Sequence, residues 1–417
     1  MRPPRVLFLV ENAPVPDDRR VWNEARTLVE AGYQVSVICP KSSWARPTER
    51  VQGITIYRFP LPFLGGIGGH LIEYGLAMPI MFLLTGVVFV REGFDVIHAA
   101  NPPDFLYWIG RVYKLFGKKF IFDQHDVVPE ACAARWSGLK LRIALAIARW
   151  GERASLRSAD VVITPNESVR RIAIERGGIH PDRVFVVRNA IRRTDFRNPR
   201  LRPELRRGKR SLVCYAGVIG PDDGLERLVL AAQHVAIQRG RRDVHFVVIG
   251  DGDCRRSIVQ MSQRLGLDDV IEFTGWVRDD RLIADYLATA DVCVAPDPKN
   301  PLNDLCSMNK IVEYMAMGKP VVAFDLDEAR ETAREAGAFV AADGSDATDA
   351  AALGDTILEL LSSPERRQRM GDAGRRRFDE VLAWEHQRDT LLQAYETLAG
   401  DLAPSPLRTN SESRGEG

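Results

Sequence analysis

Apolar residues along this chain gather in short runs that alternate with stretches of helical periodicity, and this alternation occurs twice. Short apolar runs are typical of strands that are buried on both faces, as in parallel sheets. In the first half the runs predict strands at 5–10, 33–39, 94–99, 119–122, 159–164 and 184–187. In the second half they predict a strand that begins at 211 and strands at 245–250, 271–277, 290–295 and 321–324. Helical stretches such as 19–32 stand between the strands, which favours right-handed parallel crossovers in two α/β halves.

The stretch 302–326 predicts a helix followed by a short buried strand. Ser307 is a candidate N-cap, Gly318 supplies a left-handed stop, and Pro320 follows where a helix cannot continue. Lys310 and Glu313 are three residues apart, so we expect them together on the polar face near the helix start. The expected buried stripe consists of Met308, Ile311, Val312 and Met315. A lysine beside a helix N-terminus suits an anion such as phosphate, although a solvated polar face explains the pattern equally well.

Composition narrows the class of protein. At 417 residues the chain is long enough for two or three domains, and 45% hydrophobic and 27% charged residues are typical of a soluble globular protein. The formal net charge of +1 provides no general attraction to nucleic acid. The six cysteines show no CxxC spacing, so we expect buried thiols in a reducing compartment and no zinc site. The first apolar run is too short for a signal peptide, which predicts a cytoplasmic protein.

Polar side chains follow two predicted strands of the first half, at the edge where parallel sheets bind ligands. His98 and Asn101 belong to HAANPPD, around the end of strand 94–99. Asp123, His125 and Asp126 belong to FDQHDVVPE, which follows strand 119–122. We therefore expect chemistry at this edge, with a purely structural role as the alternative for His98.

One motif carries a family resemblance. The sequence KIVEYMAMGKPVV, which begins at Lys310, resembles the C-terminal-domain signature of the family 4 glycosyltransferases, a retaining group with the GT-B fold. The resemblance implies an α/β protein of two Rossmann-like domains facing across a central cleft. It also implies that Glu313 binds the donor ribose and that Lys310 lies near the diphosphate, both as part of the catalytic set. The family usually has a second Glu earlier in the motif, where this chain has Leu305, so Asp304 is the candidate substitute.

Two segments of the first half extend the resemblance. FDQHDVVPE resembles a segment in which the His lies by the sugar and the acceptor, which implies a catalytic role for His125, with Asp126 as its neighbour and Glu130 as an acceptor contact. The segment 17–38 resembles the opening of the family, which implies that Arg20 and Glu24 line the cleft. The alternative is a surface ion pair on one helix. The predicted acceptor or cleft residues are Arg20, Asn101 and Glu130.

Loops of the second half resemble the donor-binding segments. Gly217 and Gly220 let backbone N–H groups approach a diphosphate. Many family members carry an Arg and a Lys in this loop, but here Val218 and Ile219 replace the Arg and Asp223 stands near the Lys position. That departure leaves Lys310 and the backbone amides to neutralise the diphosphate. The predicted donor-binding residues are Gly217, Gly220, Asp223, Gly250, Trp276, Val277, Asp304, Ser307, Met308 and Asn309.

The resemblance and the linker-like composition of 191–210 give a domain plan. We expect an acceptor-binding domain at 1–190, a linker at 191–210 and a nucleotide-sugar-binding domain at 211–380. A helix at 381–400 is expected to cross back onto the first domain, and 401–417 has too few apolar residues to fold.

Two helical stretches of the first half could contact a membrane. Residues 76–90 are apolar throughout but short for a spanning helix, so a buried helix is favoured over a surface that enters one leaflet. Residues 135–157 predict one basic amphipathic helix with Trp136 and Trp150 on its apolar border, which favours the inner leaflet slightly over a solvated face.

The function implied by the resemblance is transfer of a sugar from a nucleotide-sugar donor, UDP-linked in our prediction. The expected acceptor is a glycan or a polyprenol-linked glycan in bacterial cell-surface polysaccharide synthesis, and a soluble small-molecule acceptor is the alternative. The nucleotide-sugar is a co-substrate; no cofactor and no metal ion is expected, because no Asp-rich metal motif is evident. A sugar-nucleotide epimerase and a non-catalytic partner subunit remain open, whereas an NAD enzyme would need the missing GxGxxG motif.

Overall fold

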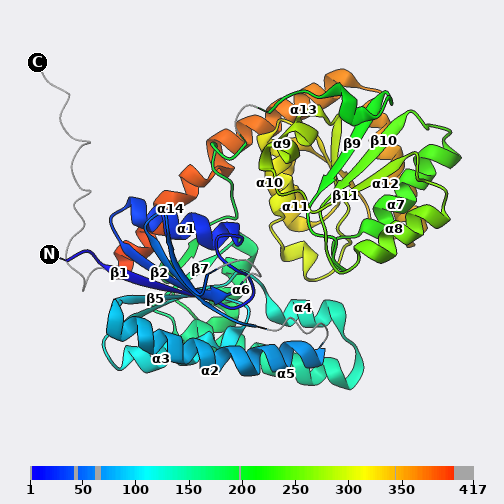
Figure 1. The fold of residues 1–417 in the computed structure, drawn as a ribbon. Coiled ribbons are helices and arrows are strands. Elements are labelled where there is room, and N and C mark those ends of the chain that lie inside the picture. The colour runs from blue at the N-terminus through cyan, green and yellow to red at the C-terminus, as the bar shows by residue number, and fades with distance from the viewer. Residues whose placement is uncertain (1, 42–45, 62–66, 197–198, 343, 399–417) are drawn as a thin grey trace, which may run out of the picture. The chain divides into compact units, whose positions relative to one another are not determined.

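The computed structural model describes residues 2–41, 46–61, 67–196, 199–342 and 344–398 (Figure 1). The chain divides into two compact units. The first contains Met1–Cys132, Trp136–Val187 and the chain from Gln387, and the second is built around Arg188–His386. Each unit holds one β-sheet of mainly parallel strands with helices packed against it, so the prediction of two Rossmann-like α/β domains is confirmed. The predicted disordered segment 401–417 lies outside the described residues.

The first unit is built on an eight-stranded sheet with the order β3-β4-β2-β1-β5-β6-β7-β8. Neighbouring strands are parallel except for the antiparallel β3–β4 pair at one edge. The strands are β1 (Arg5–Val10), β2 (Gln34–Pro40), β3 (Thr48–Val51), β4 (Ile54–Phe59), β5 (Val96–Ala100), β6 (Lys119–Asp123), β7 (Val161–Thr164) and β8 (Val184–Val186). The apolar runs do not predict the hairpin, because the edge strand β3 has the mostly polar sequence TERV.

Helices cover both faces of this sheet. Helices α2, α3 and α5 lie along one face, and α1 and α14 lie along the other (Figure 1). The helices of this unit are α1 (Arg19–Glu30), α2 (Ile67–Arg91), α3 (Tyr107–Lys114), α4 (Val128–Arg135), α5 (Gly138–Ser158), α6 (Glu167–Gly177) and the C-terminal part of α14 (Trp384–Leu398). The sequence explains where α1 begins, because the Asp18 side chain caps the helix by accepting a hydrogen bond from the Val21 N–H.

The second unit contains a six-stranded, all-parallel sheet with the order β11-β10-β9-β12-β13-β14. Its strands are β9 (Ser211–Ala216), β10 (Val244–Ile249), β11 (Ile271–Gly275), β12 (Val292–Ala295), β13 (Val321–Phe324) and β14 (Gly337–Val340). Its helices are α7 (Leu225–Gln233), α8 (Arg255–Arg264), α9 (Asp280–Thr289), α10 (Asn309–Ala316), α11 (Asp327–Ala333), α12 (Asp346–Leu361) and α13 (Pro364–Arg377). Short 3-10 helices occur at Asp104–Leu106, Pro181–Arg183, Pro203–Arg206, Asn303–Leu305 and Arg334–Ala336, and π-helical turns at His234–Gln238 and Phe378–Leu382.

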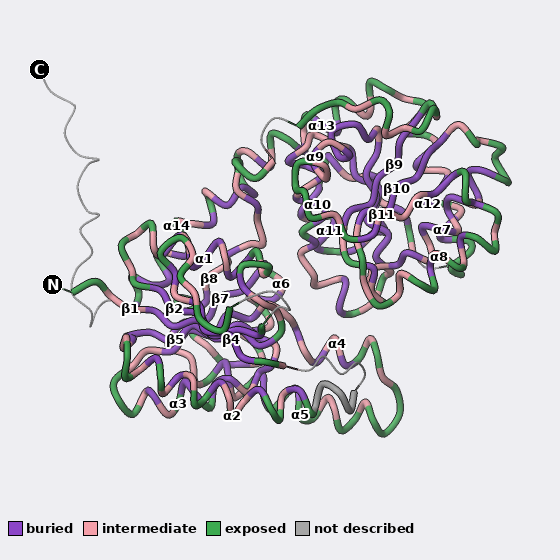
Figure 2. The backbone as a smooth tube through the Cα atoms, in the orientation of Figure 1, coloured by how far each residue is buried: buried purple, intermediate pink, exposed green. Residues whose placement is uncertain are grey.

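The strands of both sheets form the centre of each core, and Figure 2 shows them as the buried part of the tube. Successive residues of β9 alternate between two hydrophobic clusters: Val213 and Tyr215 pack with α7, α8 and α12, while Cys214 and Ala216 pack with α9, α10 and α11. Burial on both faces explains why these strands read as continuous apolar runs in the sequence.

Helix α10 corrects two details of the sequence analysis. It begins at Asn309 with Met308 at the N-cap position and no side-chain cap, so the prediction of Ser307 as N-cap is wrong. Lys310 is buried rather than on a polar face. The predicted stop is confirmed: Gly318 has a φ of 64°, and the Lys319 N–H donates to the Tyr314 carbonyl oxygen.

The two candidate membrane stretches also differ from their predictions. The predicted single helix at 135–157 is wrong, because α4 ends at Arg135 and α5 begins at Gly138. The favoured interpretation of 76–90 as a buried helix holds on one side only: Ala77, Met81 and Val88 pack into the core of the first unit. By length and composition α2 could cross a membrane, and 28% of the most apolar 18-residue stretch within Ile72–Arg91 is buried.

Candidate functional site

Both sheets reverse their strand order beside a central strand, β1 in the first unit and β9 in the second. In open parallel sheets, ligands bind beyond the carboxyl ends of the strands at such a reversal. Each unit has a polar cluster there, centred on Asp123 in the first and on Lys310 in the second.

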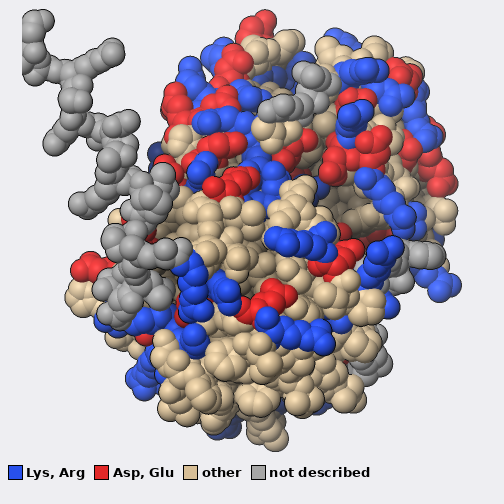
Figure 3. All heavy atoms as spheres, turned by 60° about the vertical axis from the view of Figure 1, so that its left-hand side comes forward, with Lys and Arg blue, Asp and Glu red and all other residues tan. Residues whose placement is uncertain are grey.

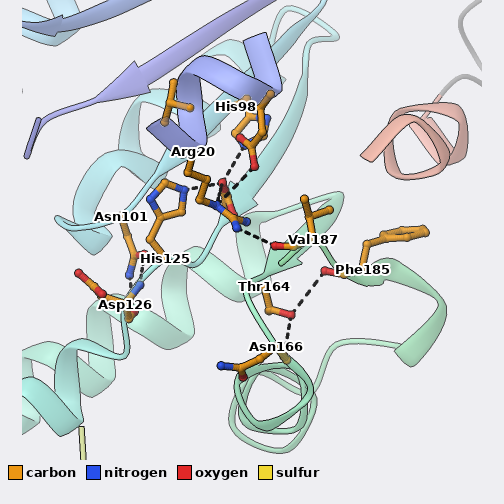
Figure 4. Close-up of polar contacts among 12 residues, drawn as sticks. Arg20, His98, Asn101, His125, Asp126, Thr164, Asn166, Phe185 and Val187 are labelled. Carbon is orange, nitrogen blue, oxygen red and sulfur yellow. Dashed lines mark hydrogen bonds and ion pairs between the residues drawn. The ribbon is translucent and has the colours of Figure 1, made fainter. Parts of the chain in front are cut away.

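The cluster of the first unit is centred on Asp123, at the end of β6 (Figure 4). The Arg20 guanidinium donates from Nη2 to Asp123 Oδ1 at 2.7 Å and from Nε to Oδ2 at 3.2 Å. His125 Nε2 lies 2.5 Å from Asp123 Oδ2, and His98 Nε2 lies 3.4 Å from the same oxygen. On its other side, His98 Nδ1 is hydrogen-bonded to the Tyr395 hydroxyl at 2.8 Å. One buried carboxylate therefore holds an arginine and a histidine and contacts a second histidine.

The protonation states in this cluster follow from burial and charge. Burial by itself would raise the pKa of Asp123, but Arg20 and His125 hold that pKa well below its usual value. Burial raises the pKa of Glu24 well above its usual value and lowers the pKa of His98, so in both side chains burial favours the neutral form. Because ionised Asp123 only accepts hydrogen bonds, a neutral His125 ring carries its proton on Nε2 and leaves Nδ1 as an acceptor.

The Arg20 side chain is buried, and besides balancing the charge of Asp123 it holds parts of the backbone together. Besides Asp123, it donates from Nη1 to the Val187 carbonyl oxygen at 2.6 Å, and its Nε lies 3.4 Å from Glu24. The alternative interpretation of Arg20 and Glu24 as a surface ion pair is wrong, because both side chains are buried. Arg20 thus connects Val187, where the chain leaves the first unit, to the carboxylate that orients His125.

The other predicted residues of the first unit lie nearby with different partners. Asn101 exchanges hydrogen bonds with the backbone of Asp126, and its Nδ2 also donates to Asp104. The carboxylate hydrogen-bonded to the His125 ring is therefore that of Asp123, not that of the predicted neighbour Asp126. Glu130 forms a bidentate ion pair with Arg176.

Glu24, Asp123 and His125 offer ligand atoms that all lie within 4.8 Å of one another, a spacing that could hold a metal ion. The charge of the site argues against one, because Arg20 already binds both oxygens of Asp123. A metal ion there would face a buried guanidinium at close range. The residues do not fit a metal centre, and no catalytic step is assigned to one.

The cluster of the second unit is centred on Lys310, in the first turn of α10. Its Nζ donates to Asp297 at 2.7 Å and to Asp223 at 3.0 Å, and it lies 5.0 Å from the centroid of the Tyr215 ring. Burial by itself would lower the pKa of Lys310, but Asp297, Tyr215 and Asp223 together raise it, so the ammonium stays charged. Asp223 Oδ2 also accepts from the Gly220 N–H at 3.0 Å. The carboxylate of Asp223 thus connects the predicted phosphate loop to the predicted phosphate-binding lysine.

Two glycine loops beside Lys310 touch backbone to backbone. A Cβ at Gly250, whose φ is 143°, would lie 1.8 Å from the Gly217 carbonyl oxygen. The Gly217 N–H donates to the Ile249 carbonyl oxygen, and the Ile219 N–H donates to that of Asp251. The missing Cβ atoms thus allow the two loop backbones to approach each other, whereas the prediction concerned the approach of a diphosphate. The amides of Gly217 and Gly220 both have partners within the protein.

The remaining predicted donor residues lie in several segments of the second unit and differ in their surroundings. Asp304 pairs with Lys299 at 2.9 Å. Trp276 is 67% exposed just after β11, and Val277 packs partly against the core. Met308 is buried, Asn309 is exposed, and Ser307 and Glu313 are half-buried.

Sequence reasoning missed Tyr395 of the first cluster, Asp297 and Tyr215 of the second, and the buried Glu11 at another strand end of the first unit. Asp297 and Glu11 follow β12 and β1, so the rule that placed Asp123 at a strand end would also have found them. Glu11 is buried, and burial together with the nearby Glu73 raises its pKa to about 7. Tyr215 and Tyr395 read only as core aromatics in strand and helix patterns. Only the fold brings Tyr395 to His98.

Comparison with known proteins identifies the family. Residues 18–190 match the family described as "Glycosyl transferase 4-like domain", and residues 210–363 match the family described as "Glycosyl transferases group 1". The chain belongs to the family 4 glycosyltransferases with the GT-B fold.

Curated relatives agree with this family. The chain is 26% identical over 237 residues to the alpha-D-kanosaminyltransferase of Streptomyces kanamyceticus, covering 55% of this chain and 58% of that enzyme's length. It is 26% identical over 400 residues to a D-inositol 3-phosphate glycosyltransferase of Thermomonospora curvata, covering 89% and 88% of the two chains. It is 36% identical over 162 residues to the phosphatidyl-myo-inositol mannosyltransferase of Mycobacterium leprae, covering 38% and 39%.

Solved structures agree with the fold. Sucrose-phosphate synthase of Thermosynechococcus elongatus superposes with a TM-score of 0.76 at 19% identity, covering 95% of this chain and all of the other. HepE of Anabaena, solved with UDP-glucose, superposes with a TM-score of 0.68 at 18% identity, covering 95% and 99%.

Proposed function

We propose that the protein is a retaining glycosyltransferase that moves a hexosyl or related sugar from a nucleotide-sugar donor to a glycan or lipid-linked acceptor. The observation that carries this proposal is the charged Lys310, held beside two closely apposed glycine loops at the strand reversal of the second sheet. Family membership supports glycosyl transfer, and this cluster supplies the cation that a diphosphate leaving group needs, next to the N-terminus of α10.

The proposed chemistry follows from how charge develops. Breaking the bond between the anomeric carbon and the diphosphate leaves negative charge on the phosphate and positive charge on the sugar ring. Lys310 and the N-terminus of α10 stabilise the leaving phosphate, and Glu313 holds the donor ribose. The acceptor oxygen attacks from the face that the phosphate leaves, and the phosphate oxygen takes the acceptor proton, which retains the anomeric configuration.

His125 is the proposed catalytic residue of the first unit. Asp123 orients its ring through Nε2, so Nδ1 can accept a hydrogen bond from a sugar or acceptor hydroxyl. Asn101 and Asp126 shape the adjacent loop. Glu130 is tied to Arg176, so an acceptor contact by Glu130 would compete with that ion pair.

The donor is proposed to be a UDP-sugar, bound without a metal ion or any other cofactor. The Anabaena neighbour was solved with UDP-glucose, and its similarity to this chain supports the fold, with UDP as the first candidate to test. Trp276 and Val277 are the proposed base contacts, next to the Gly250–Gly275 bridge. Asp304 replaces the missing family glutamate near the sugar, which requires it to exchange Lys299 for a sugar hydroxyl.

The acceptor is proposed to be lipid-linked, in cell-surface polysaccharide synthesis on the cytoplasmic side of the membrane. One relative is named a phosphatidyl-myo-inositol mannosyltransferase, which supports a lipid acceptor. The described cysteines are all free thiols, as expected in a reducing compartment.

A thermal-shift panel of UDP-, GDP- and dTDP-sugars with EDTA present tests the donor. We expect one nucleotide class to raise the melting temperature of the wild type, and Glu313→Ala to reduce that shift. His125→Ala should retain the donor shift while transfer to acceptor falls by about a hundredfold, as for loss of one preorganised hydrogen-bonding group that acts in the transition state. Silence across the panel, or full transfer by His125→Ala, would reject these assignments.

A further inference from the structure

An apolar surface of the first unit has no protein partner among the described residues. It is formed by α2, α3 and α5, which lie along the same face of the sheet (Figure 1). Low in Figure 3, a broad area has few charged side chains, and basic side chains, with some acidic ones among them, border it. Exposed apolar side chains on this α2–α3–α5 face include Leu83 and Val90 of α2, Leu115 and Phe116 after α3, and Ile143 and Ile147 of α5. Val90 is 85% exposed and Leu83 is 69% exposed, and a contiguous exposed apolar patch marks a surface that contacts a protein or a membrane.

Helix α2 lies along the unit and does not stand away from it. Its residues Ala77, Met81, Thr85 and Val88 are fully buried and share one side of the helix. The opposite side carries Leu83, Val87 and Val90 outward. This arrangement suits a helix that lies in the plane of an interface, with one side on the protein and the other in an apolar medium.

A basic hollow opens within this face, between α3 and α5. Its volume is about 810 Å³, and its lining includes Arg111 and Lys114 from α3 and Arg149, Trp150, Arg153 and Arg157 from α5. Arg149, Arg153 and Arg157 are four residues apart in succession, so they form one row along α5. Trp150, which is 54% exposed, borders the row.

Most charges of this hollow are not neutralised by the protein. Among the described residues, the side chains of Arg111, Arg149, Arg153 and Arg157 have no ion pair or hydrogen bond, while Lys114 pairs with Asp160 at 3.0 Å. The acidic side chains of the described part of α2 and of α5 are Glu73 and Glu152, and both are buried. Four guanidinium groups without counter-ions therefore share one hollow, which favours a polyanionic or phosphate-bearing occupant.

We propose that the α2–α3–α5 face binds the surface of an anionic phospholipid bilayer, with a lipid phosphate headgroup in the basic hollow. The exposed apolar side chains enter the acyl boundary, Trp108 and Trp150 sit at headgroup depth, and the arginine row pairs with phosphate oxygens. Apolar contact alone would fit a protein partner. The coincidence of apolar side chains with unpaired arginines and a headgroup-sized hollow favours lipid.

Flotation of the full chain with lipid vesicles tests this surface without any donor or acceptor. We expect the wild type to float with mixed phosphatidylcholine–phosphatidylglycerol vesicles and not with phosphatidylcholine alone, and raised salt should weaken the binding. Arg149→Glu/Arg153→Glu should reduce the partition coefficient by at least about tenfold. Arg149→Gln/Arg153→Gln should give a smaller loss, because it removes charge without adding repulsion.

Arg256→Glu/Arg264→Glu is the matched control. These arginines are exposed on α8 of the second unit and have no partner among the described residues, so the pair carries the same change of charge. The control should float like the wild type. Absence of flotation with any vesicle, undiminished binding of Arg149→Glu/Arg153→Glu, or an equal loss in the control would each overturn the proposal. Because the readout is independent of sugar transfer, failure here leaves the proposed glycosyltransferase untouched, and a silent donor panel leaves the lipid surface untouched.

Discussion

Two clusters of buried charged side chains determine how single substitutions affect this protein. In the first unit Asp123 is balanced by Arg20, and in the second unit Lys310 is balanced by Asp297. A buried ion pair contributes little by itself, but removing one partner leaves an unpaired charge away from water. Substitutions at these positions therefore change stability as well as chemistry, and the two effects have to be separated by paired variants.

Lys310 offers such a separation. Lys310→Met should destabilise the second unit by about 3 kcal/mol, because Asp297 loses its buried partner. Lys310→Met/Asp297→Asn should recover most of that loss, since no uncompensated charge remains. Urea unfolding measures the stability of each variant, and the UDP-sugar thermal shift measures donor binding. If the double variant regains both stability and the donor shift, Lys310 has no part in binding the diphosphate.

Glu11 makes stability depend on pH. Its pKa is raised to about 7 by burial and by Glu73, above the 4.5 of a free glutamate, so the folded state retains a proton that the unfolded state has lost. The stabilisation is complete below pH 4.5 and is lost as the pH rises through about 7. The free energy of unfolding of Glu11→Gln should not change with the ionisation of this side chain. The difference in this free energy between Glu11→Gln and wild type should therefore rise in favour of the variant by up to about 3 kcal/mol from about pH 5 to about pH 8.

Urea unfolding at the two pH values checks this dependence. Glu175→Gln, on the exposed side of α6, serves as the control and should follow the wild type at both. A constant difference between Glu11→Gln and wild type across the range would show that Glu11 is ionised in the folded protein.

At the scale of elements, the contact between the Gly217 and Gly250 loops is the most sensitive to a small change. Gly250→Ala places a Cβ 1.8 Å from a backbone oxygen, so the loops must separate. Gly240→Ala is a matched control, because Gly240 also has a positive φ, of 67°, but nothing within 4 Å of the added Cβ. The control should lose about 1 kcal/mol from backbone strain. Gly250→Ala should lose several times more, and its UDP-sugar shift should disappear while that of Gly240→Ala remains.

The elements themselves were largely predictable from the sequence. Strands such as β1 and β13 have the predicted bounds, because a strand buried on both faces has to be apolar throughout. The edge strand β3 was not predicted, since an exposed edge carries polar residues and leaves no apolar run. Interruptions between consecutive helices, such as the one between α4 and α5, were not predicted either, because helical periodicity continues across them.

The candidate site was predictable in its positions and not in its partners. Placing polar residues at strand ends located Asp123, His125 and Asn101, since parallel strands bring their carboxyl ends to one edge. The pairing of Arg20 with Asp123 joins residues far apart in sequence, as does that of Lys310 with Asp223. Periodicity therefore assigned Lys310 to a polar face, although its charge is balanced in the interior.

At the scale of the whole molecule, α14 belongs to both compact units. It begins with residues of the second unit, where the Trp384 N–H donates to the Ile191 carbonyl oxygen. From Gln387 it belongs to the first unit, where Leu391, Ala394 and Tyr395 are buried. The end of the chain thus completes the core of the unit that begins it.

Truncation tests this dependence. Removing the chain after His386 exposes the surface that Leu391, Tyr395 and Leu398 cover. The first unit then loses about 2 kcal/mol of stability for each of these buried side chains. We expect the first unit to melt at a much lower temperature, or to fail to fold, while the second unit retains its UDP-sugar shift. Truncation after Leu398 keeps α14 and is the control; it should leave both transitions in place. Equal melting of the two truncated proteins would mean that α14 does not stabilise the first unit.

The carboxylate of Asp223 has a consequence for selectivity among anions in solution. It already accepts from the Gly220 N–H and from Lys310, the two groups proposed to hold a diphosphate. A donor that takes both must displace this internal competitor, so a lone phosphate or sulfate gains little by entering, whereas a nucleotide-sugar adds base and sugar contacts that offset the displacement. Asp223→Asn should therefore bind inorganic phosphate more tightly than wild type does, and calorimetric titration with phosphate would reveal an unchanged affinity if the carboxylate exerts no such discrimination.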